Sequence, residues 1–65
     1  MLHRERIGQR IAQLRKEKGL SLRQLSEQCG VTFQNINKIE SGRYNVGIDI
    51  LGRIADALGV EIKIE

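Results

Sequence analysis

The chain lacks most of the residues on which enzyme and metal chemistry depend. It contains one cysteine, Cys29, and one histidine, His3, so an internal disulfide and a zinc cluster are both excluded. No Ser/His/Asp set, pair of carboxylates in a cleft or phosphate-binding loop is visible. We therefore expect no enzyme activity, no cofactor and no metal, and we interpret Cys29 as an inert core residue.

Long apolar segments are absent as well. No run approaches the roughly 20 residues that cross a bilayer, and residues 1–6 have no apolar stretch of the kind found in secretory signals. The chain also has no proline, no repeat and no low-complexity segment. A single cysteine fits a reducing compartment. These features predict a cytoplasmic protein without a membrane partner.

The size and the charge of the chain indicate what kind of partner it needs. Its 65 residues make one small domain, and a core of this size supplies only a few kcal/mol, so oligomerisation is the remaining source of stability. The net charge of +3 and the pI near 9.5 suit a polyanionic partner. Most of the basic side chains lie in residues 1–23, among them Arg10 and Arg23, our candidates for contacts with phosphates.

Apolar residues recur at helical spacing in four segments. The first covers about 4–18, the second 22–29, the third runs from Thr32 to Ser41, and the fourth covers 48–58. Ser21 and Gln24 form a capping box for the second segment, and Thr32 is an N-cap for the third. Glycines at the ends of the segments predict helix stops. The sequence therefore predicts two short helices joined by a tight turn at Gly30.

The third segment is the candidate for binding a ligand. Ile36 and Ile39 point into the core, and at 100° per residue Gln34 and Ser41 fall nearly opposite them. Asn37, Lys38 and Phe33 complete the free side. Such side chains can contact the edges of bases, and Phe33 can pack on a thymine methyl group. The alternative is an ordinary solvated helix face, with Phe33 covering the edge of the core.

The final six residues follow a different pattern. Val60, Ile62 and Ile64 alternate with charged residues, which predicts a half-buried β-strand over 60–65. One chain has no second strand to pair with it. We therefore predict antiparallel pairing of two tails across a two-fold axis, with Val60, Ile62 and Ile64 in a homodimer interface. The alternative is a frayed segment or one that lies on its own helices.

These features together resemble the Cro/C1-type (XRE-like, lambda-repressor-like) helix-turn-helix family. The resemblance covers about residues 5–60 and rests on three pieces of sequence: Leu20-Ser21-x-x-Gln24-Leu25-Ser26-x-x-Cys29-Gly30-Val31-Thr32, Ile36-x-x-Ile39-Glu40-Ser41-Gly42-Arg43 and Leu51-x-x-Ile54-Ala55-Asp56-Ala57-Leu58-Gly59-Val60. It implies an all-α, compact four-helix DNA-binding domain, here 1–59, followed by the strand at 60–65.

The resemblance also implies roles for individual residues. In this family the second helix of the motif lies in the DNA major groove. The residues that we expect to contact bases are Phe33, Gln34, Asn37 and Lys38. Those that we expect to contact the DNA backbone are Arg10, Arg23, Thr32, Asn35, Ser41 and Arg43. Arg15 and Glu40 fall where several relatives bury an ion pair.

One departure from the family pattern concerns the start of the motif. Relatives often have Gln directly after the cap of the first motif helix, where this chain has Leu22. Arg23 is the residue that we expect to replace the lost DNA contact.

The sequence as a whole predicts a transcriptional repressor. As a dimer it would bind a near-palindromic operator in double-stranded DNA and block polymerase. Two alternatives remain. An antitoxin would use the same DNA-binding face and offer the tail to a toxin, and a protein-interaction module would keep the fold without binding DNA. Salt-dependent DNA binding separates the module from the other two, and co-purification of a second small chain identifies the antitoxin.

Overall fold

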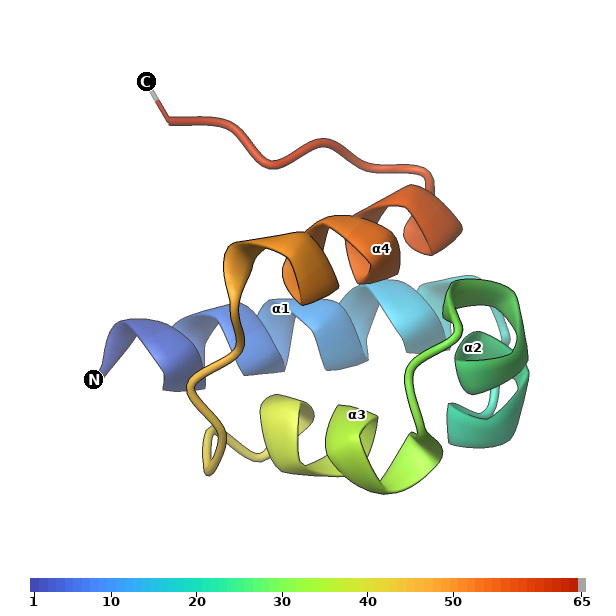
Figure 1. The fold of residues 1–65 in the computed structure, drawn as a ribbon, viewed down its shortest axis with the longest axis horizontal. Coiled ribbons are helices and arrows are strands. Elements are labelled where there is room, and N and C mark those ends of the chain that lie inside the picture. The colour runs from blue at the N-terminus through green and yellow to red at the C-terminus, as the bar shows by residue number, and fades with distance from the viewer. Residues whose placement is uncertain (65) are drawn as a thin grey trace.

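Four helices form the fold. The computed structural model describes residues 1–64, in which the helices are α1 (His3–Glu17), α2 (Leu22–Cys29), α3 (Phe33–Glu40) and α4 (Ile48–Leu58). In the view of Figure 1, α3 and α4 lie on opposite sides of α1, and α2 lies beside the carboxyl end of α1. α3 packs on α1 and α2, and α2 also packs on α4. The expected all-α, four-helix architecture is confirmed.

The turn between α2 and α3 is held by caps at both helix starts. The Ser21 Oγ accepts a hydrogen bond from the Gln24 N–H at 3.1 Å, and the Gln24 side chain accepts one from the Ser21 N–H at 2.8 Å. The Thr32 hydroxyl accepts from the Asn35 N–H at 3.3 Å. Gly30 ends α2 with a φ of 73°, a backbone angle at which a side chain would be strained. These contacts fix where α3 begins and in which direction it runs.

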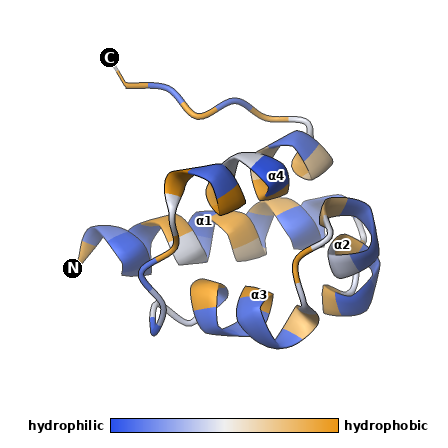
Figure 2. Ribbon diagram, in the orientation of Figure 1, coloured by the Kyte–Doolittle hydropathy of each residue, from blue (hydrophilic) through white to orange (hydrophobic). Residues whose placement is uncertain are grey.

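The core is built from the apolar faces of all four helices. Figure 2 shows these faces turned towards one another. The side chains with almost no exposed surface are Leu25, Ile36, Ile39, Ile54 and Leu58. Since α3 buries Ile36 and Ile39, its opposite face is left to solvent.

A close approach between α1 and α3 depends on Gly8. Gly8 is buried, and a Cβ atom built on it would overlap the backbone carbonyl oxygen of Ile39 and press on that of Glu40. A hydrogen in place of a side chain therefore lets the two helices approach at this point. The sequence analysis did not single out Gly8, because its importance depends on which helices cross there.

The predicted β-strand at the end of the chain is wrong for the residues that the structure describes. Residues 60–64 form no strand, and Glu65, the last residue of that prediction, lies outside the described part. The physical reason is that no other segment within residues 1–64 forms a strand that could pair with it. In the view of Figure 1 the tail runs back above α4, and Ile62 and Ile64 line a groove together with residues of α1 and α4. Val60 is half-buried, whereas Ile62 is 42% and Ile64 97% exposed.

Candidate nucleic-acid interface

The outer face of α3 presents a row of polar side chains. Gln34, Asn37, Lys38 and Ser41 are all exposed, and they lie on the side of α3 opposite buried Ile36 and Ile39. Three of the four residues expected to contact bases therefore share one accessible helical surface. Amide groups on such a surface can donate to and accept from the edges of bases in a major groove, and an ammonium group can donate to them.

The carboxyl end of α3 holds a linked set of polar groups. The Ser41 hydroxyl donates to the backbone carbonyl of Lys38 at 3.0 Å, and the Arg43 Nε donates to the Ser41 Oγ at 2.9 Å. Arg43 is otherwise exposed. Ser41 thus orients Arg43 beside the helix, where its guanidinium is free to meet a phosphate.

The amino end of α3 carries Thr32, Asn35 and Phe33. Thr32 and Asn35 are exposed, and Phe33 is half-buried. The Arg23 guanidinium lies over the Phe33 ring, with its central carbon 4.7 Å from the ring centroid. This distance is within the range of a cation–π interaction. The sequence analysis missed the contact, because it depends on the angle between α2 and α3 and no sequence pattern records that angle.

Arg10 is placed apart from the other candidate phosphate ligands. Its guanidinium donates to the Gln13 side chain at 2.9 Å, within α1. It lines a groove of about 510 Å³ together with Leu51 of α4 and Ile62 of the tail. Gly8, two residues earlier, faces α3, so Arg10 projects from nearly the opposite side of α1.

A largely buried ion pair joins α1 to the end of α3. The Arg15 Nε donates to Glu40 Oε2 at 2.7 Å and its Nη2 donates to Oε1 at 3.0 Å, so the contact is bidentate. The two side chains are only 12% and 10% exposed. A third donor, Nη1, bonds the backbone carbonyl of Leu20 at 2.8 Å. Glu40 raises the pKa of Arg15 above its ordinary value, mainly through this hydrogen bonding.

The same pair fixes the direction of α3. Arg15 connects the last turn of α1, the carboxyl end of α3 and the segment that enters α2. A second contact lies at the amino end of α1, where the Arg4 Nε donates to the backbone carbonyl of Gly42 at 3.1 Å. These two contacts hold the carboxyl end of α3 against α1.

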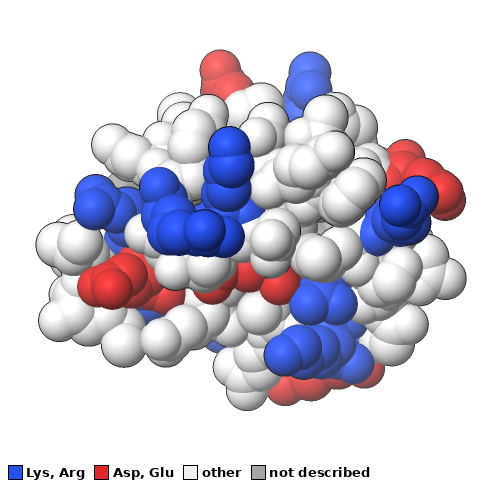
Figure 3. Space-filling model, turned by 90° about the horizontal axis from the view of Figure 1, so that it is seen from below, with Lys and Arg blue, Asp and Glu red and all other residues white. Residues whose placement is uncertain are grey.

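Basic side chains lie on the side of the molecule that carries α3. Figure 3 looks at this side, where Lys and Arg side chains stand in several separate groups. Some acidic side chains lie among them. The basic groups on this side are candidates for contacts with the phosphates of a duplex.

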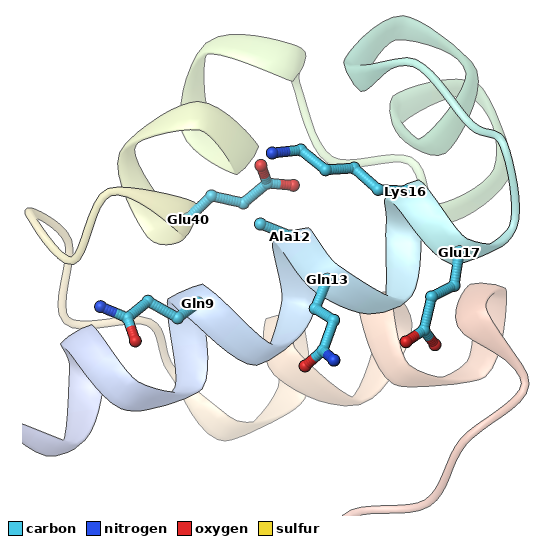
Figure 4. A pocket seen from close by; sticks show the side chains of 6 residues that line it. All are labelled: Gln9, Ala12, Gln13, Lys16, Glu17 and Glu40. Atoms are coloured by element: carbon cyan, nitrogen blue, oxygen red, sulfur yellow. The ribbon is translucent and has the colours of Figure 1, made fainter.

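A shallow polar hollow lies between α1 and the end of α3. It is lined by Gln9, Ala12, Gln13, Lys16, Glu17 and Glu40. Figure 4 shows Lys16 and Glu40 extending towards each other above Ala12. Glu40 is already bound by Arg15, so its carboxylate is committed to the structure. Within residues 1–64 there is no group of three His, Cys, Asp or Glu side chains that is arranged to hold a metal ion.

None of the described helices is both long enough and apolar enough to cross a bilayer.

A family model described as helix-turn-helix matches residues 11–64. The HTH-type transcriptional regulator SinR of Bacillus subtilis is 42% identical over 57 residues, which are 86% of this chain and 51% of SinR. The immunity repressor of Bacillus phage phi105 is 38% identical over 57 residues, which are 88% of this chain and 40% of the repressor. The chain spans about two fifths of the length of several curated relatives that it matches.

A solved structure gives the same result for the fold. The clp gene regulator ClgR from C. glutamicum superposes with a TM-score of 0.91 at 32% sequence identity, over 95% of this chain and 80% of that one. The arrangement of α1 to α4, including the direction of α3, is therefore shared with a gene regulator of known structure.

Proposed function

Because this chain belongs to the helix-turn-helix family, we propose that it binds double-stranded DNA sequence-specifically and acts as a transcriptional repressor. The observation that supports this most strongly is the outer face of α3, where Gln34, Asn37 and Lys38 are exposed on a helix that is capped and held at both ends. Relatives named as a transcriptional regulator and an immunity repressor support the same assignment.

The mechanism follows from the chemistry of each side chain. With α3 in the major groove, the Gln34 amide matches N6 and N7 of adenine, and Lys38 matches O6 and N7 of guanine. Asn37 is exposed on the flank of the same face that also carries Phe33, where it can reach a neighbouring base. Backbone phosphates are contacted by residues around the helix ends, namely Arg23, Thr32, Asn35, Ser41 and Arg43. Phosphate contacts set affinity and register, and base contacts select the sequence.

Replacing Gln34 with alanine is expected to relax the choice of base at one position. Affinity for the preferred operator should fall by about 1–3 kcal/mol, while affinity for unrelated duplexes should barely change. The measurement is a fluorescence anisotropy titration on the operator and on single-base variants of it. An equal loss on all sequences would show that Gln34 does not contact a base.

Arg43→Ala serves as the matched comparison for Gln34→Ala, because both residues are exposed and belong to or border α3. It should weaken binding to every duplex alike and lower the slope of log affinity against log salt by about one unit. A slope that stays unchanged would remove Arg43 from the phosphate contacts.

We also propose that the regulator acts as a homodimer that uses its tail. Ile62 and Ile64 expose apolar surface, and so does Ile48 at 65%. They line the apolar groove between α1 and α4 described above. A second copy related by a two-fold axis would cover these side chains. If the operator half-sites are one turn of DNA apart, the dimer holds its two copies of α3 about 34–36 Å apart.

The double substitution Ile62→Asp, Ile64→Asp is expected to give a monomer with weak operator affinity, because two carboxylates would be buried in the interface. Analytical ultracentrifugation measures the oligomeric state, and Glu61→Ala is the control for a change in the tail that leaves the apolar side chains intact. A double variant that still sediments as a dimer would place the interface elsewhere.

A further inference from the structure

The stacked pair Arg23 and Phe33 joins α2 to the amino end of α3. Phe33 is the first residue of α3, one position before Gln34, and its ring is half-buried. Arg23 belongs to α2 and is exposed. Within the described residues, the Arg23 side chain has no ion pair and no hydrogen bond, and the Phe33 ring at 4.7 Å is its one recorded interaction partner. Its N–H donors are therefore available to a ligand.

The position of the pair on α3 indicates which part of a ligand it meets. At 100° per residue, Phe33 and Asn37 lie on the same flank of the outer face, and Lys38 lies on the other flank with Gln34 between them. At the amino end of α3, Phe33 neighbours Gln34 on this flank, and the Arg23 guanidinium lies over the Phe33 ring. The order is an amide that can contact a base, then an apolar surface, then an unpaired cation.

This order matches one feature of the major groove. The C5 methyl group of thymine is the apolar group exposed there, and it lies on the side of the groove nearest the sugar–phosphate backbone of its own strand. Beside it stands a phosphate. An apolar ring followed by a cation is complementary to a methyl group followed by a phosphate.

We propose that Arg23 and Phe33 act as one recognition unit, in which the Phe33 ring packs on a thymine methyl group while Arg23, held over the ring, donates to the adjacent phosphate. The inference rests on the proposed DNA binding and specifies the base that this flank of α3 selects. The stack restricts the Arg23 side chain before DNA arrives, which reduces the entropy lost on binding. Arg23 is thus a positioning residue for Phe33 as well as a phosphate ligand.

The test uses an operator selected with the full chain and the same operator with each thymine replaced in turn by deoxyuridine. This replacement removes only the methyl group. For the unaltered protein, one thymine in each half-site should lose about three- to fivefold in affinity, the value of one buried methyl group. For Phe33→Ala, thymine and uracil at that position should bind equally well, whereas Phe33→Leu should keep part of the difference.

Arg23→Gln tests the coupling within the pair. It should weaken binding to all duplexes, lower the salt slope by about one unit, and reduce the preference for thymine over uracil. Arg53→Gln is the matched control, because Arg53 is exposed on α4, across α1 from α3, and it should change none of these three quantities. In the double variant Arg23→Gln, Phe33→Ala, the fold-loss of operator affinity should be smaller than the product of the fold-losses in the two single variants.

Three outcomes would overturn the unit. The first is a preference for thymine over uracil that is unchanged in Phe33→Ala. The second is an Arg23→Gln variant that changes affinity at a single base pair and leaves the salt slope unchanged. The third is a double variant whose loss of affinity equals the product of the two single losses. Failure of the proposed function looks different, because the unaltered protein would then show no sequence preference. Circular dichroism of each variant confirms that the helices are retained.

Discussion

Arg15→Met is expected to leave the domain partly unfolded at 25 °C. The substitution removes the cation that bonds Glu40 at 2.7 and 3.0 Å and leaves a carboxylate that is only 10% exposed without a partner. Breaking such a pair from one side costs about 3–5 kcal/mol. A domain of this size has about 3–10 kcal/mol in total, so the loss is a large fraction of its stability. Urea unfolding followed by circular dichroism measures it.

The double variant Arg15→Met, Glu40→Leu separates loss of the pair from loss of packing. With both charges removed, no buried ion remains, and much of the stability should return. The recovery should be incomplete, since the carbonyl of Leu20 also loses its hydrogen bond from Arg15. If the double variant is as unstable as the sum of the two single variants, the two residues do not interact in solution.

Gly8→Ala should be the most damaging small substitution in α1. The added methyl group would overlap the carbonyl oxygen of Ile39, and backbone on both sides of the contact cannot move aside without separating α1 from α3. We expect a loss of about 2–3 kcal/mol, at the upper end of the usual range for overpacking. DNA affinity should fall as well, because α3 is the helix displaced. Thermal unfolding and operator titration measure the two effects.

Gly52→Ala provides the matched control for Gly8→Ala. Gly52 also lies inside a helix, α4, but a Cβ atom built on it meets nothing within 4 Å. Alanine there should be neutral or should stabilise the fold by up to about 1 kcal/mol, because it favours the helix over the unfolded chain. Equal destabilisation by both substitutions would mean that the contact with Ile39 is not the cause of the loss at Gly8.

The helices were predictable because their signals are local. Ser21, Gln24 and Thr32 form the caps expected from their spacing, and Gly30 has the left-handed backbone that ends α2. The spacing of Ile36 and Ile39 was sufficient to identify the buried face of α3. Each of these features depends on residues within a few positions of one another, so sequence periodicity records it.

The parts that could not be predicted depend on how the helices cross. The overlap at Gly8 and the stack of Arg23 on Phe33 both join different helices, and no local pattern distinguishes them from ordinary surface or spacer residues. The tail shows the opposite case. Alternation in residues 60–65 is a real local signal for an extended segment, but a strand needs a partner, and the chain supplies none within the described residues.

Selection of bound duplexes from a random pool, followed by titration of the winning site, tests the central claim most directly. We predict a near-palindromic consensus with half-sites about 10 base pairs apart. The affinity for this site should be at least about 10³-fold above that for a scrambled duplex at the same salt concentration. Replacing Gln34, Asn37 and Lys38 together with alanine should make the affinities for the selected site and the scrambled duplex equal, while the fold is retained. A pool that yields no consensus, or a ratio that survives the triple substitution, would contradict the assignment of the α3 outer face as the DNA-binding surface.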